Sequence, residues 1–341
     1  MPNKKLRVTR QDVAKRAGVS TATVSYVLNG LGDVNNISRE TQNRVREAVA
    51  ELNYVRNISA QRLATGKSKV IFIMADNKAV NFSINPTLHQ IHQGVSEVCF
   101  KYGFNSNVHG VYNNDWGSIR EELVLSHRVD GLIIVNPPNN HHVIQELTDN
   151  NFPIVALGSA RFPHKYSVNI DNFDAARIAT NHLIAKGHQD IVHITFSELD
   201  LTDVAERAAG YKKAMVDANL ASKCVIRYAG YSFEKAFKVM DALLASDTPP
   251  TAVFAGNDII AIGCMSAIWK NGLNIPEDVA IVGFDDIPFA AYLTPPLTTV
   301  KLDGQKQGEL AANILLDLVE GNTPPQNTAL LESPLIIRDS T

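Results

Sequence analysis

The stretch from Val8 to Leu28, VTRQDVAKRAGVSTATVSYVL, constrains the fold more than any other part of the chain. Thr9 stands three residues before Asp12 in an arrangement like a capping box, which predicts a helix from Arg10 to about Ala17. Gly18 follows and can supply the positive φ that a tight turn between helices requires. The sequence therefore predicts a helix that stops at a glycine turn.

A second helix is expected directly after this turn. Ser20 can cap it, and the apolar pattern carries it to about Leu28. Two short helices joined by a glycine turn present the exposed side of the second helix, where small or hydrogen-bonding side chains can reach base edges in a major groove. The candidate base-reading residues are Ser20, Thr21, Ala22, Thr23, Ser25, Tyr26 and Asn29.

A third helix should cover the first two. Ser38 can cap it, and apolar residues recur at helical spacing from Val45 to Leu52. The connection from Asn29 to Ser38 carries the sequence GLGDVNNI, which predicts an extended loop.

Charge is distributed unevenly along the chain. Residues 1–69 hold 13 Lys or Arg against 5 Asp or Glu, a formal +8, whereas the whole chain carries −3, so the remainder carries −11. A basic module on an acidic body fits a protein that neutralises phosphates with one end only, and it predicts salt-sensitive binding. The alternative, a solvated basic tail, is disfavoured because the positive residues lie within a helical pattern.

The run DVAKRAGVSTATVSYVLNG, together with the AQRL tetrapeptide at Ala60–Leu63, closely resembles the LacI/GalR family of bacterial transcription regulators, and the rest of the chain continues to match. The resemblance implies a helix-turn-helix DNA-binding domain at 1–56. Two features depart from the family. Tyr26 stands where the family commonly has Arg or another polar residue, and the loop before Ser38 is about three residues longer than usual.

By the same resemblance, residues 57–69 form a hinge helix and linker that orders on DNA. Leu63, with Ala60 beside it, would contact the minor groove, and the leucine would wedge into it and kink the duplex. The alternative is a plain linker. Gly66-Lys67-Ser68 is not a phosphate-binding loop, because Gln61 stands where that motif needs a glycine.

From Val70 onward the chain alternates continuous apolar runs with amphipathic helical stretches. This pattern predicts an α/β fold with parallel sheets covered on both faces, and its length favours two lobes. The expected strands are the runs VIFIM, GLIIV, IVAL, IVHIT, AVFA and VAIVGF, which begin at residues 70, 131, 154, 191, 252 and 279. The resemblance implies a two-lobed effector-binding and dimerisation domain of periplasmic-binding-protein type at 70–341. Its N-lobe would span about 70–167 and 301–327, and its C-lobe about 168–300 and 328–341.

Ligands of open parallel sheets bind outside the carboxyl ends of the strands, so candidate residues should follow strands. Asp76, Ser159, Asn257 and Asp285 do so. The resemblance adds Arg207 and Tyr231 as cleft residues, with Asp203 as a further candidate. Carboxylate, amide, guanidinium and phenol groups together suit a sugar, sugar phosphate or nucleoside.

Two observations allow other roles for these residues or another ligand. The Asn257-Asp258 pair could instead cap a helix, and one of Asp285-Asp286 could hold a loop. Gly158 stands where some family members carry a ligand-binding Asp, so the ligand need not be theirs.

Other classes of function lack support in the sequence. The chain shows no nucleophile or opposed acid–base pair and no metal-binding spacing of His or Cys, so we expect neither enzyme nor cofactor. Its three cysteines are typical of reduced, buried thiols, and it has neither a membrane-spanning run nor a signal peptide. We therefore expect a cytoplasmic protein.

These expectations combine into one function. The chain should be a repressor that binds operator DNA as a homodimer or a higher oligomer, because one reading helix gives too small an interface for genomic specificity. A small-molecule effector in the cleft would change that binding through a reciprocal coupling whose sign stays open. The alternatives are a cytoplasmic small-molecule binding protein that acts as an activator or a corepressor-dependent regulator, and, least favoured, a sugar-metabolising enzyme.

Overall fold

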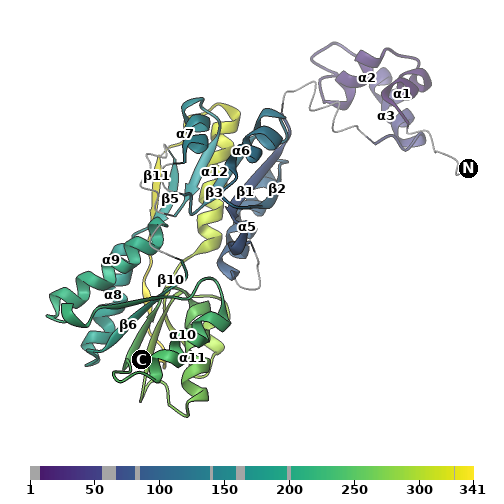
Figure 1. The fold of residues 1–341 in the computed structure, drawn as a ribbon. Helices are drawn as coiled ribbons and strands as arrows, with labels where there is room; N and C mark the ends of the chain where they lie inside the picture. Colours follow the sequence, from purple (N-terminus) through teal and green to yellow (C-terminus); the bar gives the residue numbers. More distant parts are fainter. Residues whose placement is uncertain are drawn as a thin grey trace, which may run out of the picture. The chain divides into compact units, whose positions relative to one another are not determined.

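The computed structural model of the chain (Figure 1) divides into two units, residues 1–67 and 68–341, which are described separately. The residues that the structure describes are 8–55, 67–80, 85–138, 141–158, 166–197, 201–325 and 327–341. Ala60, Leu63 and Ser159, which the sequence singles out, lie outside the described residues.

The first unit contains the three predicted helices, which are α1 (Arg10–Ala17), α2 (Thr21–Leu28) and α3 (Arg39–Glu51). Thr9 and Asp12 form the expected capping box, in which the backbone N of Thr9 donates to Asp12 Oδ2 at 2.7 Å. Gly18 ends α1 with a φ of 68°. Ser20 and Ser38 cap the other two helices by accepting a backbone hydrogen bond each. Local capping chemistry therefore sets all three helix starts.

These helices enclose a small apolar core. The buried residues that form it are Val13, Ala14, Ala17, Val24, Val27, Val45, Ala48 and Tyr54. The helical spacing of the sequence predicts most of this set, whereas Tyr54, which follows α3, is an addition.

The long connection between α2 and α3 is folded around one buried glutamine. Gln42 is only 6% exposed, and its Nε2 donates to Asp33 Oδ1 at 2.8 Å and to the carbonyl O of Ile37 at 3.0 Å. Gly32 leaves room for this side chain, since a Cβ there would lie 2.6 Å from Gln42 Cδ. This side chain therefore holds the loop against α3.

The second unit contains two six-stranded sheets. The first has the order β11-β5-β4-β3-β1-β2 and is built from β1 (Val70–Asp76), β2 (Asn105–Val111), β3 (Gly131–Val135), β4 (Ile154–Leu157), β5 (Ser167–Ile170) and β11 (Thr328–Leu331). The second has the order β12-β10-β9-β8-β6-β7 and is built from β6 (Ile191–Thr195), β7 (Val225–Tyr228), β8 (Ala252–Ala255), β9 (Ala280–Asp285), β10 (Thr298–Lys301) and β12 (Leu335–Ile336). All paired strands run parallel except β10 and β12.

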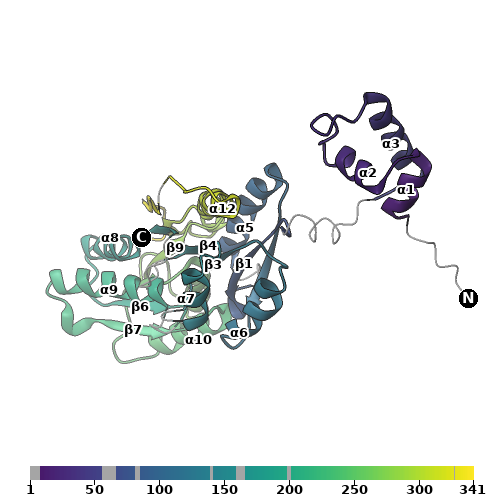
Figure 2. The same cartoon turned by 90° about the horizontal axis from the view of Figure 1, so that it is seen from above.

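Helices cover both faces of each sheet, as Figures 1 and 2 show. On the first sheet, α5 (Pro86–Lys101) and α12 (Gly304–Glu320) pack on one face, and α6 (Trp116–Ile119), the π-helix η2 (Arg120–Leu125) and α7 (His142–Asp149) pack on the other. On the second sheet, α8 (Asn172–Ala185) and α9 (Thr202–Asp217) pack on one face, and α10 (Phe233–Leu244) and α11 (Asp258–Lys270) on the other. Short 3-10 turns add η1 (Asn77–Ala79), η3 (Ala221–Lys223) and η4 (Ala290–Tyr292). This layering confirms the predicted α/β class.

The chain crosses between the lobes three times, slightly later than the sequence suggests. Residues 168–170 and 328–331 were expected in the second lobe, but β5 pairs with β4 and β11 pairs with β5, so both strands belong to the first sheet. The crossings therefore follow Ile170, Lys301 and Leu331. Strand pairing therefore places these boundaries slightly later than the family resemblance implies.

Three further features concern the described ranges only. None of their helices combines the length and apolar character needed to cross a membrane. Their His, Cys, Asp and Glu side chains form no group of three or more that could hold a metal ion. Cys99 and Cys264 are buried and unbridged, and Cys224 is half-buried.

Candidate functional site

In the first unit, α2 presents much of its predicted reading face to solvent. The exposed candidates, apart from the cap, are Thr21, Ala22, Tyr26 and Asn29. Ser20 and Thr23 form a hydrogen bond with each other at the helix cap, where their hydroxyl oxygens lie 2.9 Å apart. Ser25 is half-buried, and Arg10 Nη1 donates to its Oγ at 3.4 Å. The helix therefore offers a row of small polar groups and one aromatic ring of the kind that can contact base edges.

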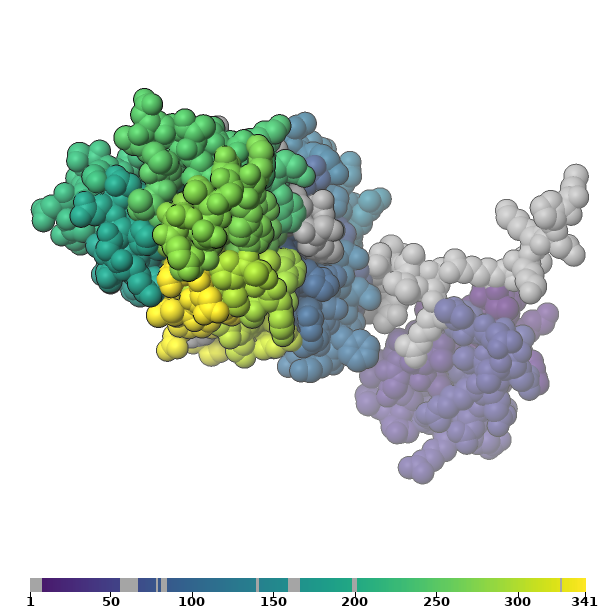
Figure 3. Space-filling view, turned by 90° about the horizontal axis from the view of Figure 1, so that it is seen from below, coloured from purple at the N-terminus to yellow at the C-terminus, as the bar shows by residue number. Residues whose placement is uncertain are grey.

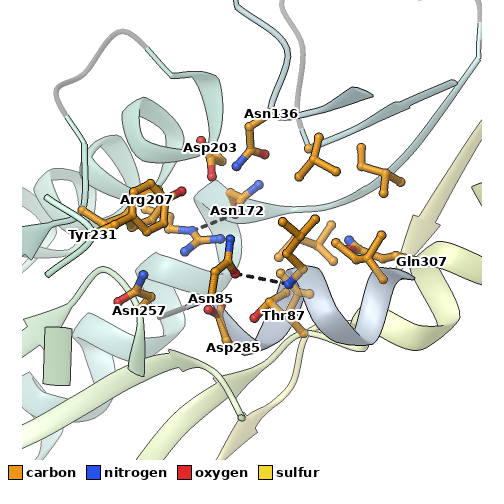
Figure 4. Close-up of a pocket in the computed structure, with 18 residues that line it drawn as sticks. Asn85, Thr87, Asn136, Asn172, Asp203, Arg207, Tyr231, Asn257, Asp285 and Gln307 are labelled. Carbon is orange, nitrogen blue, oxygen red and sulfur yellow. Dashed lines mark hydrogen bonds between the residues drawn. The ribbon is translucent and has the colours of Figure 1, made fainter. Parts of the chain in front are cut away.

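In the second unit, the candidate ligand site is a cavity of about 600 Å³, open mouth included, between the two lobes. It lies where strands of both sheets end, since Asn136 follows β3, Asn257 follows β8 and Asp285 closes β9. Its polar lining (Figure 4) comprises Asn85, Thr87, Asn136 and Gln307 from the first lobe and Asn172, Asp203, Arg207, Tyr231, Asn257 and Asp285 from the second.

Arg207, on α9, is the central cation of this cavity. It is 4% exposed, and its Nε donates to Asn172 Oδ1 at 2.9 Å while its Nη1 donates to the carbonyl O of Gly256 at 2.7 Å. Its guanidinium carbon lies 3.6 Å from the centroid of the Phe284 ring. Acceptors and an aromatic face thus fix the plane of the guanidinium, and its remaining N–H groups can serve a ligand.

Two carboxyl groups flank this arginine. Burial raises the pKa of Asp285 to about 6, although Arg207 acts in the opposite direction. Burial also raises the pKa of Asp203, and Arg207 again partly offsets the effect. Asp203 Oδ1 accepts a hydrogen bond from the backbone N of Val204 at 2.9 Å. The site therefore combines one fixed cation with two carboxyls whose charge costs free energy because they are buried.

Each of these carboxyls has a polar neighbour on the opposite lobe. Asn136 acts to lower the pKa of Asp203, and Thr87 acts to lower the pKa of Asp285. Figure 4 shows Thr87 beside Asp285 and Asn136 beside Asp203. The two lobes thus present paired hydrogen-bonding groups to the same space.

Tyr231 and Asn257 complete the wall of the second lobe. The Tyr231 ring lies tilted against Phe196 with ring centroids 4.8 Å apart, and burial, then Asp203 and Asp285, raise the pKa of its phenol. Asn257 is 4% exposed, and its Oδ1 caps α11 by accepting from the backbone N of Ile260 at 2.9 Å. The capping role that the sequence allowed for Asn257 is thus present, and the residue also lines the cavity.

The remaining acidic candidates lie elsewhere. Asp76, at the end of β1, does not line the cavity but borders an adjoining wider hollow together with Tyr228, Ser232 and Lys235. Asp286 pairs with Arg338, whose Nη2 donates to its Oδ1 at 2.7 Å. Asp285 and Asp286 therefore diverge, as expected for adjacent side chains, and form no opposed carboxylate pair.

Sequence reasoning missed several lining residues, namely Asn85, Thr87, Asn136, Asn172 and Gln307. Asn136 directly follows the predicted strand β3, so the same strand-end rule could have found it. Asn172 begins α8 just after a lobe crossing that was predicted a few residues too early.

Comparison with known proteins extends these observations over the whole chain. Residues 9–57 match the family described as bacterial regulatory proteins, lacI family, and residues 180–341 match a periplasmic binding protein-like domain. A protein of Aliivibrio salmonicida, named HTH-type transcriptional repressor PurR, is 34% identical over 318 residues, which cover 92% of each chain.

Two solved structures are similar along nearly the whole chain. The lac repressor dimer bound to operator and the anti-inducer ONPF gives a TM-score of 0.85 at 29% identity and covers 98% of this chain and 99% of that chain. The complex of the transcriptional regulator CelR with cellobiose gives a TM-score of 0.71 at 27% identity and covers 98% of this chain and 100% of that one. Helix-turn-helix unit, two-lobed unit and order of the two are thus shared with repressors, and the chain belongs to the LacI family of bacterial transcription regulators.

Proposed function

We propose that this protein represses transcription by binding operator DNA through α2, and that a small molecule in the cleft between the lobes controls this binding. The cluster around Arg207 carries the proposal, because a buried arginine held by Asn172 and Gly256 beside two carboxyls is a preformed polar site. The basic first unit and the exposed face of α2 support the DNA-binding part. The similar proteins support it too, since they are named repressors or hold operator DNA.

Charge in the cavity favours an uncharged ligand over a sugar phosphate. Its described lining contains one cation, Arg207, and two carboxyls, Asp203 and Asp285, and every other polar lining group is neutral. A phosphate would add negative charge to a space in which burial already raises carboxyl pKa values. Carboxylates, amides and the Tyr231–Phe196 wall suit vicinal hydroxyls and a flat ring face. The effector is accordingly a neutral sugar or a nucleoside.

The protein acts as a homodimer in the cytoplasm, where it meets DNA. Two reading helices give the interface that one cannot, and near-palindromic half-sites follow from the symmetry of the dimer. Segment 57–69 connects each three-helix unit to its effector unit, with Ala60 and Leu63 at the minor groove. Lobe movement on ligand binding would change how the two segments approach each other.

A thermal-shift screen of the full chain tests the effector class. The panel comprises glucose, cellobiose, D-ribose, inosine and adenosine, with glucose 6-phosphate as the charged counterpart of glucose. A ligand at about 100 times its Kd stabilises the folded state by about 2.7 kcal/mol, so a binder raises Tm by several degrees. Glucose 6-phosphate should give no shift.

The active compound is then added to an operator fragment selected from random DNA, and affinity is measured by fluorescence anisotropy. A change of about 5-fold to 150-fold is expected, and its sign distinguishes inducer from corepressor. Binding of the compound without any change in operator affinity would contradict the allosteric proposal, and a larger shift with the phosphate would contradict the neutral-ligand argument.

A further inference from the structure

The turn that presents Asp285 to the cavity has an unfavourable backbone. Asp285 and the next residue, Asp286, both have positive φ, 114° and 53°. Residues with a Cβ rarely adopt such angles, and two in succession persist only where the surrounding structure holds them. Two groups of contacts do so, one inside the second lobe and one from the C-terminal segment.

The inner group centres on Asp258, which is completely buried at the start of α11. Its Oδ2 accepts from the backbone N of Ile287 at 2.9 Å, and its Oδ1 accepts from Thr299 Oγ1 at 2.6 Å. Gly283 makes this approach feasible, because a Cβ there would lie 2.2 Å from Asp258 Oδ1. Asp258 thus fixes the far side of the turn to strand β10.

The outer group centres on Arg338. Its Nη2 donates to Asp286 Oδ1 at 2.7 Å, and its Nη1 donates to the carbonyl O of Leu297 at 2.7 Å. Both partners of the ion pair are largely buried, with side chains 18% and 17% exposed. A charged hydrogen bond shielded from water to this degree is stronger than a surface pair. Arg338 therefore holds Asp286 in place, and Asp286 is adjacent to the cavity residue.

The segment that carries Arg338 is anchored to the same sheet and comes from the other lobe. β12 pairs with β10, and Ser340, which is fully buried, donates through its Oγ to the carbonyl O of Ile281 at 2.6 Å. In the space-filling view the yellow C-terminal residues lie against the light-green surface of the second lobe (Figure 3). This segment directly follows β11 of the first sheet, so it is also one of the three lobe crossings.

We propose that Arg338 is a positioning residue of the cleft: by holding Asp286 it fixes the strained turn that directs the Asp285 carboxyl into the cavity. The expected effect on effector affinity rests on the proposed function. The role of Arg338 in holding the turn rests only on the contacts described above. Because the crossing segment carries Arg338, movement between the lobes acts on the turn as well.

Hydrogen exchange of the full chain without ligand tests the turn directly. Arg338→Ala should raise exchange of the backbone amides at residues 285–289 about tenfold, since it removes a charge-assisted hydrogen bond that restrains local opening. Arg338→Lys should restore most of the protection, because an ammonium can still pair with Asp286. Arg177→Ala is the matched control: it removes an arginine from the partly exposed ion pair with Asp174 on α8, which does not contact the turn, and should leave residues 285–289 unchanged.

Should Arg338→Ala fail to fold, Asp286→Asn removes the charge of the same ion pair from the other side and keeps the bond from Arg338 to Leu297. It should raise exchange at the same residues, but by less, because the amide oxygen can still accept from Arg338. Unchanged exchange at 285–289 in these variants, or an increase spread evenly over the second sheet, would overturn the proposal.

The functional consequence is tested by measuring the affinity of the protein for the panel compound that raises Tm most. Arg338→Ala should weaken its binding about tenfold by calorimetry, and Arg177→Ala should not. A faster-exchanging turn with unchanged affinity would overturn the link to the cleft. If no panel compound binds, the effector class proposed above fails while the exchange result still decides the role of Arg338.

Discussion

At the scale of single residues, Arg207 determines both the shape and the charge of the candidate ligand site. Arg207→Ala leaves the carbonyl of Gly256 without its donor and two buried carboxyls without their cation. We expect a loss of about 2–4 kcal/mol in the free energy of unfolding, measured with urea, and no Tm response to the effector. Operator affinity without effector should change little, because the reading helix belongs to the other unit.

Arg177 offers a matched control for this substitution. It lies on α8 and pairs with Asp174 in a partly exposed, i,i+3 ion pair, so Arg177→Ala should cost no more than about 0.5 kcal/mol. Ligand affinity unchanged in Arg207→Ala would show that the cavity is not the effector site.

Tyr26 is the residue of α2 on which the second prediction rests. The residue is 41% exposed, so its side chain is free to contact a base edge. Tyr26→Ala should cost about 1–3 kcal/mol on the preferred operator and little on random DNA, measured by anisotropy at one salt concentration. Equal losses on both DNAs would instead assign Tyr26 to backbone contact or packing.

At the scale of elements, the apolar pattern predicts six of the eight strands that lie inside the two sheets and misses the edge strands. β1, β3, β4, β6, β8 and β9 correspond to the six predicted runs, and all six lie inside their sheets. β2, with the sequence NSNVHGV, is an edge strand whose partial exposure allows polar residues, so it gives no continuous apolar signal. β5 and β10 are buried but contain Ser, Asn or Thr that a pattern of apolar residues excludes.

The residues of the candidate ligand site also divide into those that the sequence predicts and those that it misses. Strand-end residues such as Asn257 and Asp285 can be predicted, because the carboxyl ends of parallel strands meet at one edge. Gln307 lies within a helix that returns from the second lobe to the first, and only the three-dimensional crossing brings it to the cavity. The sequence does not predict a role for Arg338 near the cleft, for the same reason.

The segment between the two units carries the third prediction, which comes from the sequence alone. Residues 57–65 are too few and too polar to form a stable helix in isolation, so they should order only when two copies meet on DNA. Leu63→Ala should weaken specific binding and reduce the operator bend, measured by circular-permutation gel shift, without altering dimerisation or effector affinity. The same bend angle in this variant and the parent protein would argue for a plain linker.

At the scale of the whole molecule, buried ionisable groups make stability depend on pH in two opposing ways. His193 is fully buried on β6, its Nδ1 donates to the carbonyl O of Phe254 at 2.9 Å, and burial lowers its pKa to about 4. The unfolded chain takes up a proton on this residue below about pH 6.5, but the folded chain does not until about pH 4, so His193 lowers stability as pH falls through this window. Asp285 has a raised pKa and therefore acts in the opposite sense. Its contribution to the free energy of unfolding is lost as pH rises through about 6.

A variant separates the histidine contribution. His193→Asn keeps a donor for Phe254 and does not titrate. We expect the variant to have a lower free energy of unfolding than the parent protein, measured with urea for the transition of the second unit. This difference should shrink by about 2 kcal/mol between pH 7.5 and pH 5. A disadvantage that stays constant with pH would mean that His193 does not remain neutral in the folded state.

The three lobe crossings have a consequence for how the protein is made. Because β11 completes the first sheet and β12 joins the second, neither lobe is finished until the chain has been synthesised through residue 336. Helix α12 and both strands come after all other parts of the cleft, so a growing polypeptide on the ribosome holds two incomplete sheets with uncovered edges. The helices α1 to α3 need none of these residues and can fold as soon as they emerge. The unit that carries α2 is therefore complete well before the candidate ligand site has formed.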